Sequence, residues 1–234
     1  TSLTLPASVT AVKGTKSMFW NTLISQLKEI RVAAGNTSFI SDNGVLYTTG
    51  HKALIAIPNK YDLSSTTYIY SINPNCVKVY PDAIPSYLNI KKLNIPAATT
   101  DLSFGTWPQF SYSTFTLEEF DVDTDNSAFC SIDGVIYDKE KAQVLLYPPG
   151  KQDTHFTIPD NVTTVAKYVF YNNSYLTSIN FNNVQTVDAC AVFSCSLLQT
   201  ITIPSSLTSI STGAFQTCPK MSKYIVEAGN PNYS

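Results

Sequence analysis

The sequence is poor in charge, and this scarcity excludes several kinds of partner. Charged residues are 14% of the 234, Arg31 is the only arginine, and the formal net charge is −2. Because a protein that follows a phosphate backbone needs a basic patch, nucleic acid is not expected as a partner. No apolar run approaches the roughly 18 residues that cross a bilayer, so no membrane span is predicted. The polar surface must come from Ser, Thr, Asn and Tyr, which suits an extracellular setting.

Groups that perform catalysis or bind metals are also few. The sequence has two histidines, His51 and His155, and neither lies in a nucleophile or metal-ligand motif. The acidic stretch from Glu118 to Asp125 places carboxylates at alternating strand positions, a spacing that does not match a calcium loop. The five cysteines include no C-x-x-C pair, so neither a zinc cage nor a full disulfide framework is implied. We therefore predict no catalytic residue, no metal and no cofactor, and a protein that is not an enzyme.

What the sequence does contain is a hexapeptide pattern, apolar-x-x-apolar-x-apolar, in six copies. Its last three residues alternate inward and outward as in a strand, and its first apolar residue is expected to enter the core before the strand begins. The copies start at Leu27, Ile90, Leu117, Leu176, Leu198 and Met221.

Apolar residues between these copies recur at a fixed spacing. Counted from Ile158 they lie 4, 7, 12, 18 and 21 residues further on, and the same offsets recur from Ile203. Proline follows several of the expected strands, and because proline removes a ladder donor it ends each strand there. The pattern predicts a coil of parallel strands, one per turn of about 23 residues, in which each turn contacts only its neighbours.

Two related insertions interrupt this coil. SDNGVLYTTGHKALIAIPNK (41–60) and SIDGVIYDKEKAQVLLYPPGK (131–151) each indicate a β-hairpin, because a strand, a polar turn and an aliphatic run that stops at proline follow one another. An Asn-x-x-aromatic motif introduces each, so the insertions are expected at about 36–60 and 126–151. A third copy of this opening stops in mid-motif at 229–234, so we expect that the native chain continues or that the sequence is a truncated piece.

A family resemblance rests on two stretches of the second half of the chain. Residues 156–181 read FTIPDNVTTVAKYVFYNNSYLTSINF, and residues 201–226 read ITIPSSLTSISTGAFQTCPKMSKYIV. Strand-Ile-Pro, Val-Thr-x-Val and Ala-Phe with a Cys or Asn shortly after resemble the BspA-type leucine-rich repeats. The hairpin DGVIYDKEKAQVLLYPPGK is similar to one that recurs in that family. The resemblance is strong over 156–234 and loose over 1–32 and 68–115.

The resemblance implies a fold and a class of function. The fold would be a leucine-rich-repeat solenoid with an irregular convex side and inserted β-hairpins, forming a single domain over residues 1–234. Members of the family are mostly bacterial, and some protozoan, surface or secreted proteins. An extracellular or cell-surface location is therefore expected, with adhesion to, or recognition of, a protein or another host-surface macromolecule as the function.

The residue between the two inward positions of each strand is expected on the open face of the sheet, which repeat proteins use for ligands. Down the stack these residues are Thr4, Arg31, Ile69, Asn94, Asp121, Thr157, Asn180, Thr202 and Ile225. We predict ligand contacts at Arg31, Asn94, Asp121, Thr157, Asn180 and Thr202. The first three are preferred, because their polar groups are directional. A passive, solvated face is the alternative.

Three further hypotheses stay open. Exposed aromatic residues would make the chain a glycan-binding module, unless they serve only core or rim packing; they are Trp107, Phe110, Tyr112, Tyr171 and Tyr175. The chain would otherwise be a structural spacer within a larger surface protein. Cys195 and Cys218 lie one turn apart, which places their Cα atoms about 5 Å apart, within disulfide reach. A stacked pair of buried thiols is the alternative for these two.

Overall fold

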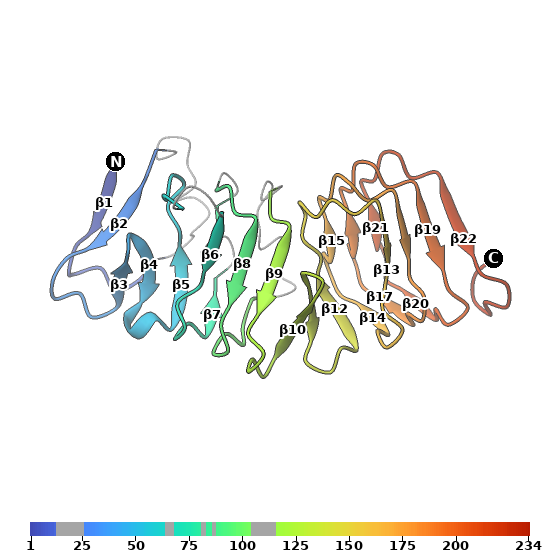
Figure 1. Ribbon diagram of the computed structural model, residues 1–234, viewed down its shortest axis with the longest axis horizontal. Helices are drawn as coiled ribbons and strands as arrows, with labels where there is room; N and C mark the ends of the chain where they lie inside the picture. The colour runs from blue at the N-terminus through green and yellow to red at the C-terminus, as the bar shows by residue number, and fades with distance from the viewer. Residues whose placement is uncertain (13–25, 64–67, 81–82, 86–87, 104–115) are drawn as a thin grey trace. The chain divides into compact units, whose positions relative to one another are not determined.

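The computed structural model describes residues 1–12, 26–63, 68–80, 83–85, 88–103 and 116–234 (Figure 1). The chain forms two compact units, of which unit 1 is Thr1–Thr114 with Asp123–Ser127, and unit 2 is Phe115–Val122 with Ala128–Ser234. Both are built from turns of a parallel β-solenoid, which confirms the predicted fold class. The assignment of residues 1–234 to a single domain stays a prediction.

Unit 1 contains two pairs of parallel strands and a four-stranded sheet. The pairs are β1 with β2 and β6 with β8, and the sheet has the order β3-β4-β5-β7. The elements are β1 (Ser2–Leu5), β2 (Glu29–Val32), β3 (Phe39–Asp42), β4 (Val45–Thr48), the 3-10 helix η2 (Thr49–His51), β5 (Ala53–Ala56), β6 (Ile69–Ser71), β7 (Lys78–Val79) and β8 (Lys92–Ile95).

Unit 2 begins with one strand and three antiparallel strands and continues as regular turns. The elements are β9 (Glu119–Val122), β10 (Phe129–Ile132), β11 (Val135–Asp138), β12 (Gln143–Leu146), β13 (His155–Thr157), β14 (Thr164–Val165), β15 (Phe170–Tyr171), β16 (Ser178–Asn180), β17 (Thr186–Val187), β18 (Val192–Phe193), β19 (Thr200–Ile203), β20 (Ser209–Ile210), β21 (Phe215–Gln216) and β22 (Lys223–Val226).

Each regular turn of unit 2 contributes one strand to each of three parallel ladders. The main sheet is β13-β16-β19-β22; Figure 1 labels β13, β19 and β22, and β16 lies between β13 and β19. The other sides of the turns pair as β14-β17-β20 and β15-β18-β21, in strands of two residues. The side away from the main sheet, predicted to be irregular, therefore contains two narrow ladders. Strands this short produce no alternating pattern that the sequence would reveal.

The core of unit 2 consists of the repeated apolar positions. Ile158, Phe181 and Ile203 follow one another in successive turns and are at most 3% exposed. Val165 and Val187 pair in the second ladder and are completely buried, as are Leu176 and Leu198 ahead of the main strands. Each turn thus adds a layer of side chains to one continuous core, because a solenoid turn cannot bury its apolar face alone.

The two insertions are three-stranded meanders, each with one strand more than a hairpin. In the first, β3 and β4 are antiparallel across the turn Asn43-Gly44, whose φ values are 47° and 84°. In the second, β10 and β11 are antiparallel across Asp133-Gly134, with φ of 48° and 78°. Two successive positive φ angles define a type I′ turn, which matches the twist of the strands. The last strand of each meander then joins a solenoid ladder, β5 with β7 and β12 with β14.

Each hairpin turn docks against the parallel strand that precedes its meander, β2 in unit 1 and β9 in unit 2. The Ile30 N–H donates to the Gly44 carbonyl oxygen at 2.8 Å, and ninety residues later the Phe120 N–H donates to that of Gly134 at 3.0 Å. A Cβ on Gly134 would lie 3.2 Å from the Glu119 Cα, so this approach requires glycine. The meander therefore covers the edge of β9 at the point where the next parallel strand would pair.

The Asn-x-x-aromatic motifs cap the proline-ended strands. In each motif the asparagine Nδ2 donates to a proline carbonyl oxygen of the preceding turn, at 2.9, 3.0 and 2.6 Å. The pairs are Asn36 with Pro6, Asn126 with Pro96, and Asn230 with Pro204. Buried backbone groups need such partners. The asparagine of one turn therefore binds the proline carbonyl that ends the strand of the preceding turn. The motif at Asn230 makes the same hydrogen bond as the two before it.

Candidate functional site

Three of the predicted site residues lie in one row on the main sheet of unit 2. Thr157 pairs with Asn180, Asn180 with Thr202, and Thr202 with Ile225. Thr157 is exposed, whereas Asn180 and Thr202 are half-buried. Asn180 uses its Oδ1 to accept the Asn182 N–H at 2.9 Å. The predicted face therefore exists here, and its polar groups are partly engaged within their own turns.

In unit 1, Arg31 lies where the sequence placed it. It pairs with Thr4 across β1 and β2, and its side chain is 62% exposed. The guanidinium group forms an ion pair with Glu29, two residues earlier on the same face of β2. An exposed pair of this kind leaves the arginine accessible to a ligand.

The predicted neighbour of Asn94 was wrong. Asn94 pairs with Ser71, and Ile69 pairs with Lys92, two residues away from the predicted position. The sequence Tyr68-Ile69-Tyr70 predicts the two tyrosines as the inward pair of this strand, with Ile69 between them on the open face. In the structure Tyr68 has a positive φ of 52° and precedes the strand, and Tyr70 and Ile72 are buried instead.

Asn94 is bound within unit 1. Its Nδ2 donates to the Ser71 Oγ at 2.9 Å. Its Oδ1 is buried and is the one buried side-chain oxygen or nitrogen that lacks a hydrogen-bond partner in the part of the chain described. Asp121 belongs to unit 2 and is exposed on β9. Ligand binding by Arg31, Asn94 and Asp121 stays a prediction.

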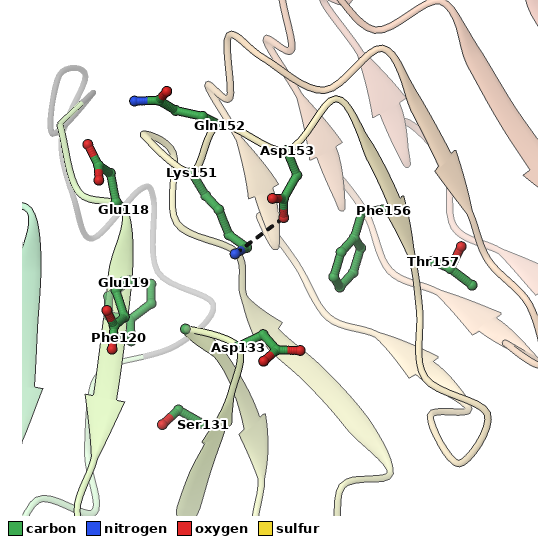
Figure 2. Close-up of a pocket in the computed structure, with 11 residues that line it drawn as sticks. Glu118, Glu119, Phe120, Ser131, Asp133, Lys151, Gln152, Asp153, Phe156 and Thr157 are labelled. Atoms are coloured by element: carbon green, nitrogen blue, oxygen red, sulfur yellow. Dashed lines mark ion pairs between the residues drawn. The ribbon is translucent and has the colours of Figure 1, made fainter.

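A cleft of about 1040 Å³ lies in unit 2 where the meander covers the edge of β9 (Figure 2). Three segments form it: β9, the turn between β10 and β11, and the stretch that leads into β13. Its lining is Glu118, Glu119, Phe120, Ser131, Asp133, Gly134, Lys151, Gln152, Asp153, Phe156 and Thr157. Of the predicted site residues, only Thr157 is among them, and Asp121 lies on the same face of β9 as Glu119.

Polar groups on one wall of the cleft hold each other in place. Figure 2 shows Lys151 reaching from its loop toward Asp153, and the Lys151 Nζ lies 3.3 Å from the Asp153 Oδ2. The same oxygen accepts the hydroxyl of Tyr147 at 3.0 Å. Burial, followed by the charge of Asp153, raises the pKa of Tyr147 well above its usual range, so this hydroxyl stays protonated and donates.

An aromatic cluster supports the cleft from the core side. Phe156, which lines the cleft, packs edge-on against Tyr147 at 4.9 Å between ring centroids and contacts Phe170 at 5.8 Å. Phe170 and Tyr147 are at most 2% exposed. The cleft thus combines four carboxylates and one lysine at its walls with an apolar ring, a combination suited to a side chain that has both a charge and an apolar stem.

The first meander has a related but smaller cavity in unit 1. Its volume is about 350 Å³, and its lining is Gln26, Lys28, Asn59, Lys60, Tyr61, Asp62, Leu88 and Asn89. Lys28 occupies the position that Glu118 holds ninety residues later, and Tyr61 corresponds to Lys151. The repeated architecture therefore recurs with different charges, which is the pattern expected of surfaces that vary in specificity.

His155 lies beside a serine on the main sheet of unit 2. The His155 Nδ1 lies 2.7 Å from the Ser178 Oγ, but both side chains lie on the outer face of adjacent strands. The nearest acid in sequence, Asp153, is already held by Lys151 and Tyr147. Within the described ranges, no group of three or more His, Cys, Asp or Glu is arranged to hold a metal ion.

The aromatic residues considered for glycan binding are only partly described. Trp107, Phe110 and Tyr112 lie outside the described residues. Tyr171 stacks on Phe193 with ring centroids 5.7 Å apart and an interplanar angle of 12°. One ring face of each is therefore covered, which reduces the flat surface that a sugar ring would need. Tyr175 is 38% exposed.

Known families and structures match this architecture. Residues 151–231 match the BspA type Leucine rich repeat region in 6 copies. A leucine-rich repeat protein from Eubacterium ventriosum superposes with a TM-score of 0.58 at 18% identity, covering 97% of this chain and 66% of that one. The pneumococcal vaccine antigen PcpA superposes with a TM-score of 0.54 at 15% identity, covering 97% of this chain and 62% of that one.

These matches establish the fold, and the chain spans less than two thirds of the length of either structure. No curated protein matches the chain in sequence. In the portion of the chain that is described, no helix has the length and apolar character needed to cross a bilayer.

Proposed function

We propose, from the premise that residues 151–231 are a BspA-type leucine-rich repeat region, that the chain is a non-catalytic surface or secreted module that binds another protein. Leucine-rich repeats commonly bind proteins through an extended, rigid sheet. One structure with this fold is named a vaccine antigen, and a protein exposed on a cell surface suits that use.

The cleft beside the second meander is the observation that carries this proposal. Backbone hydrogen bonds fix its walls: the Phe120 N–H donates to the Gly134 oxygen at 3.0 Å, and the Gly150 N–H donates to that of Leu117 at 2.8 Å. A site held by backbone pairing loses little entropy when a ligand binds. The adjoining row that starts at Thr157 extends this surface along the main sheet.

A binding assay with matched variants tests the proposal. The purified chain is presented to a panel of extracellular-matrix and epithelial surface proteins on a biosensor. Asp133→Asn gives the second turn the Asn-Gly sequence of the first and removes one carboxylate from the cleft without changing turn type. Combined with Asp153→Asn, it should weaken binding of the recognised protein at least tenfold. A triple variant of Arg31, Asn94 and Asp121 tests the strand face separately.

The control variant lies at the equivalent cavity of unit 1. Asp62→Asn removes a carboxylate there and should leave affinity unchanged if the unit 2 cleft is the site. Unaltered binding in the cleft variant and in the triple variant would contradict recognition through these surfaces. Binding to a glycan array that Trp107→Ala abolishes would instead support a glycan-binding module, and absence of binding in both assays would support a spacer.

A further inference from the structure

One position of the solenoid turn is occupied by Asn173, Cys195 and Cys218 in succession. Each lies two residues after a strand of the third ladder, in which Tyr171 pairs with Phe193 and Phe193 with Gln216. The two cysteines are therefore in register on neighbouring turns. Parallel strands lie about 4.8 Å apart, and this separation falls within the Cα range that disulfides occupy.

The two thiols differ in their surroundings. Cys195 is completely buried in the core of unit 2, and its Sγ donates to the Phe170 carbonyl oxygen at 3.3 Å. Cys218 is partly exposed, and its Sγ donates to the carbonyl oxygen of Gln216 at 3.4 Å. A small reagent therefore has access to Cys218 and not directly to Cys195.

The thiols also interact with each other. When Cys218 is deprotonated, the Cys195 S–H turns from the Phe170 oxygen to the thiolate, and this hydrogen bond lowers the pKa of Cys218 to about 7. The same bond, followed by burial, raises the pKa of Cys195. Among the described residues, Tyr224 also interacts with Cys218, and its pKa is raised by burial and then by that sulfur. Since the thiolate is the nucleophile in thiol–disulfide exchange, Cys218 is the thiol that reacts first near neutral pH.

We propose that Cys195 and Cys218 are a modification site at which a low-molecular-weight disulfide converts the two thiols into a disulfide that joins successive turns. The Cys218 thiolate attacks one sulfur of the small disulfide, whose S–S bond breaks and releases one thiolate. Cys195 then attacks the Cys218 sulfur and passes its proton to the departing small thiolate, so that the second small molecule leaves as a thiol. Two protein thiols are oxidised, and one small disulfide is reduced to two thiols.

The same position has a purely structural use, which the test must distinguish. Asn173 is buried at this position and hydrogen-bonds backbone groups. In the structural alternative, each cysteine serves only to donate its S–H to a carbonyl oxygen and forms no disulfide. The other cysteines supply internal controls. Cys76, Cys130 and Cys190 do not occupy this position and have no cysteine on the neighbouring turn in register with them.

The experiment uses the purified chain and oxidised glutathione as the probe at pH 7.5. After quenching with acid and N-ethylmaleimide, chymotrypsin is used for digestion, because no Lys or Arg separates Cys195 from Cys218. The expected result is a linked peptide pair that contains these two residues, two fewer alkylated cysteines per chain, and full reversal by a reducing agent. Cys130 and Cys190 should stay alkylated or gain single glutathione adducts.

A variant defines the order of the two steps. In Cys195→Ala the second step has no nucleophile, so a glutathione adduct should accumulate on Cys218. Alkylation of Cys218 by iodoacetamide should also shift its midpoint above pH 7, because the hydrogen bond is gone. The wild-type result alone decides the proposal: a stable glutathione adduct on Cys218 with Cys195 still alkylated, or no reaction at either, would overturn it.

Discussion

Removing the side chain of Asn173 should strongly destabilise unit 2. Asn173 is completely buried. Its Nδ2 donates to the carbonyl oxygens of Lys151 at 3.0 Å and Pro149 at 3.2 Å. Its Oδ1 accepts the N–H groups of Tyr175 and Leu176, both at 2.8 Å. One amide group thus holds the end of the meander and the start of the next turn together.

The expected loss of unfolding free energy follows from the backbone groups that Asn173→Ala leaves without partners. In Asn173→Ala, two buried N–H groups lose their acceptor, at roughly 1–3 kcal/mol each, and two carbonyl oxygens lose a donor. A net loss of about 3–5 kcal/mol is expected, a large share of the 5–15 kcal/mol typical of a folded domain. Asn173→Cys should be less damaging, because Cys195 and Cys218 occupy this position in the next two turns and a thiol retains one donor.

Urea denaturation followed by circular dichroism measures these differences. Ser174→Ala, at the half-buried neighbouring position, is the matched control and should cost less than about 0.5 kcal/mol. A loss below about 1 kcal/mol in Asn173→Ala would refute the reasoning, since it would mean that these four backbone groups find other partners at no cost.

Two other perturbations test the hairpin turn of unit 2 and the tyrosine pair of unit 1. Gly134→Ala and Gly35→Ala each place a side chain at a positive φ, which costs about 1–2 kcal/mol. A Cβ on Gly134 would in addition contact Glu119, whereas nothing lies within 4 Å of a Cβ on Gly35. Urea midpoints should show the larger loss for Gly134→Ala, and equal losses would argue against docking of the turn. Burial raises the pKa of Tyr47 to about 12 from 10.0, and its hydroxyl bonds that of Tyr70 at 3.0 Å. The pKa of Tyr47 is higher in the folded state than in the unfolded state. The stability that the protonated Tyr47 contributes is therefore present below pH 10 and is lost as pH rises through 12. Between pH 9 and 12, tyrosinate absorbance follows the ionisation of the tyrosines and circular dichroism follows the folded fraction. In Tyr47→Phe the stability should fall less steeply with pH than in the wild type.

The sequence was most informative where each turn repeats the one before. The offsets from Ile158 identified the core layers, because each of these turns buries its side chains at the same points. The same offsets from Ile203 were wrong at their last position, since Tyr224 is 49% exposed. The row that contains Thr157, Asn180 and Thr202 followed from the same periodicity. The register of β6 was wrong because the local alternation of Tyr68, Ile69 and Tyr70 does not show where the strand begins.

The cleft was not predicted, because it results from contacts between distant segments. Lys151, Asp153 and Phe156 follow the hairpin, and nothing in their spacing shows that β9 lies opposite them. A signal was nevertheless present in Asn43-Gly44 and Asp133-Gly134. Dipeptides of this type predict tight type I′ turns. A glycine that must approach another strand closely would have indicated where the meander docks.

The most direct test of the proposed function is photo-cross-linking from the cleft. A benzophenone amino acid replaces Gln152, an exposed cleft residue, and a second variant carries it at the exposed Lys167, which is not among the residues that line the cleft. After irradiation with the protein identified in the binding panel, a protein-binding cleft predicts a covalent adduct from position 152 and little or none from position 167. An adduct from position 167 alone, or equal yields from both positions, would contradict recognition through the cleft.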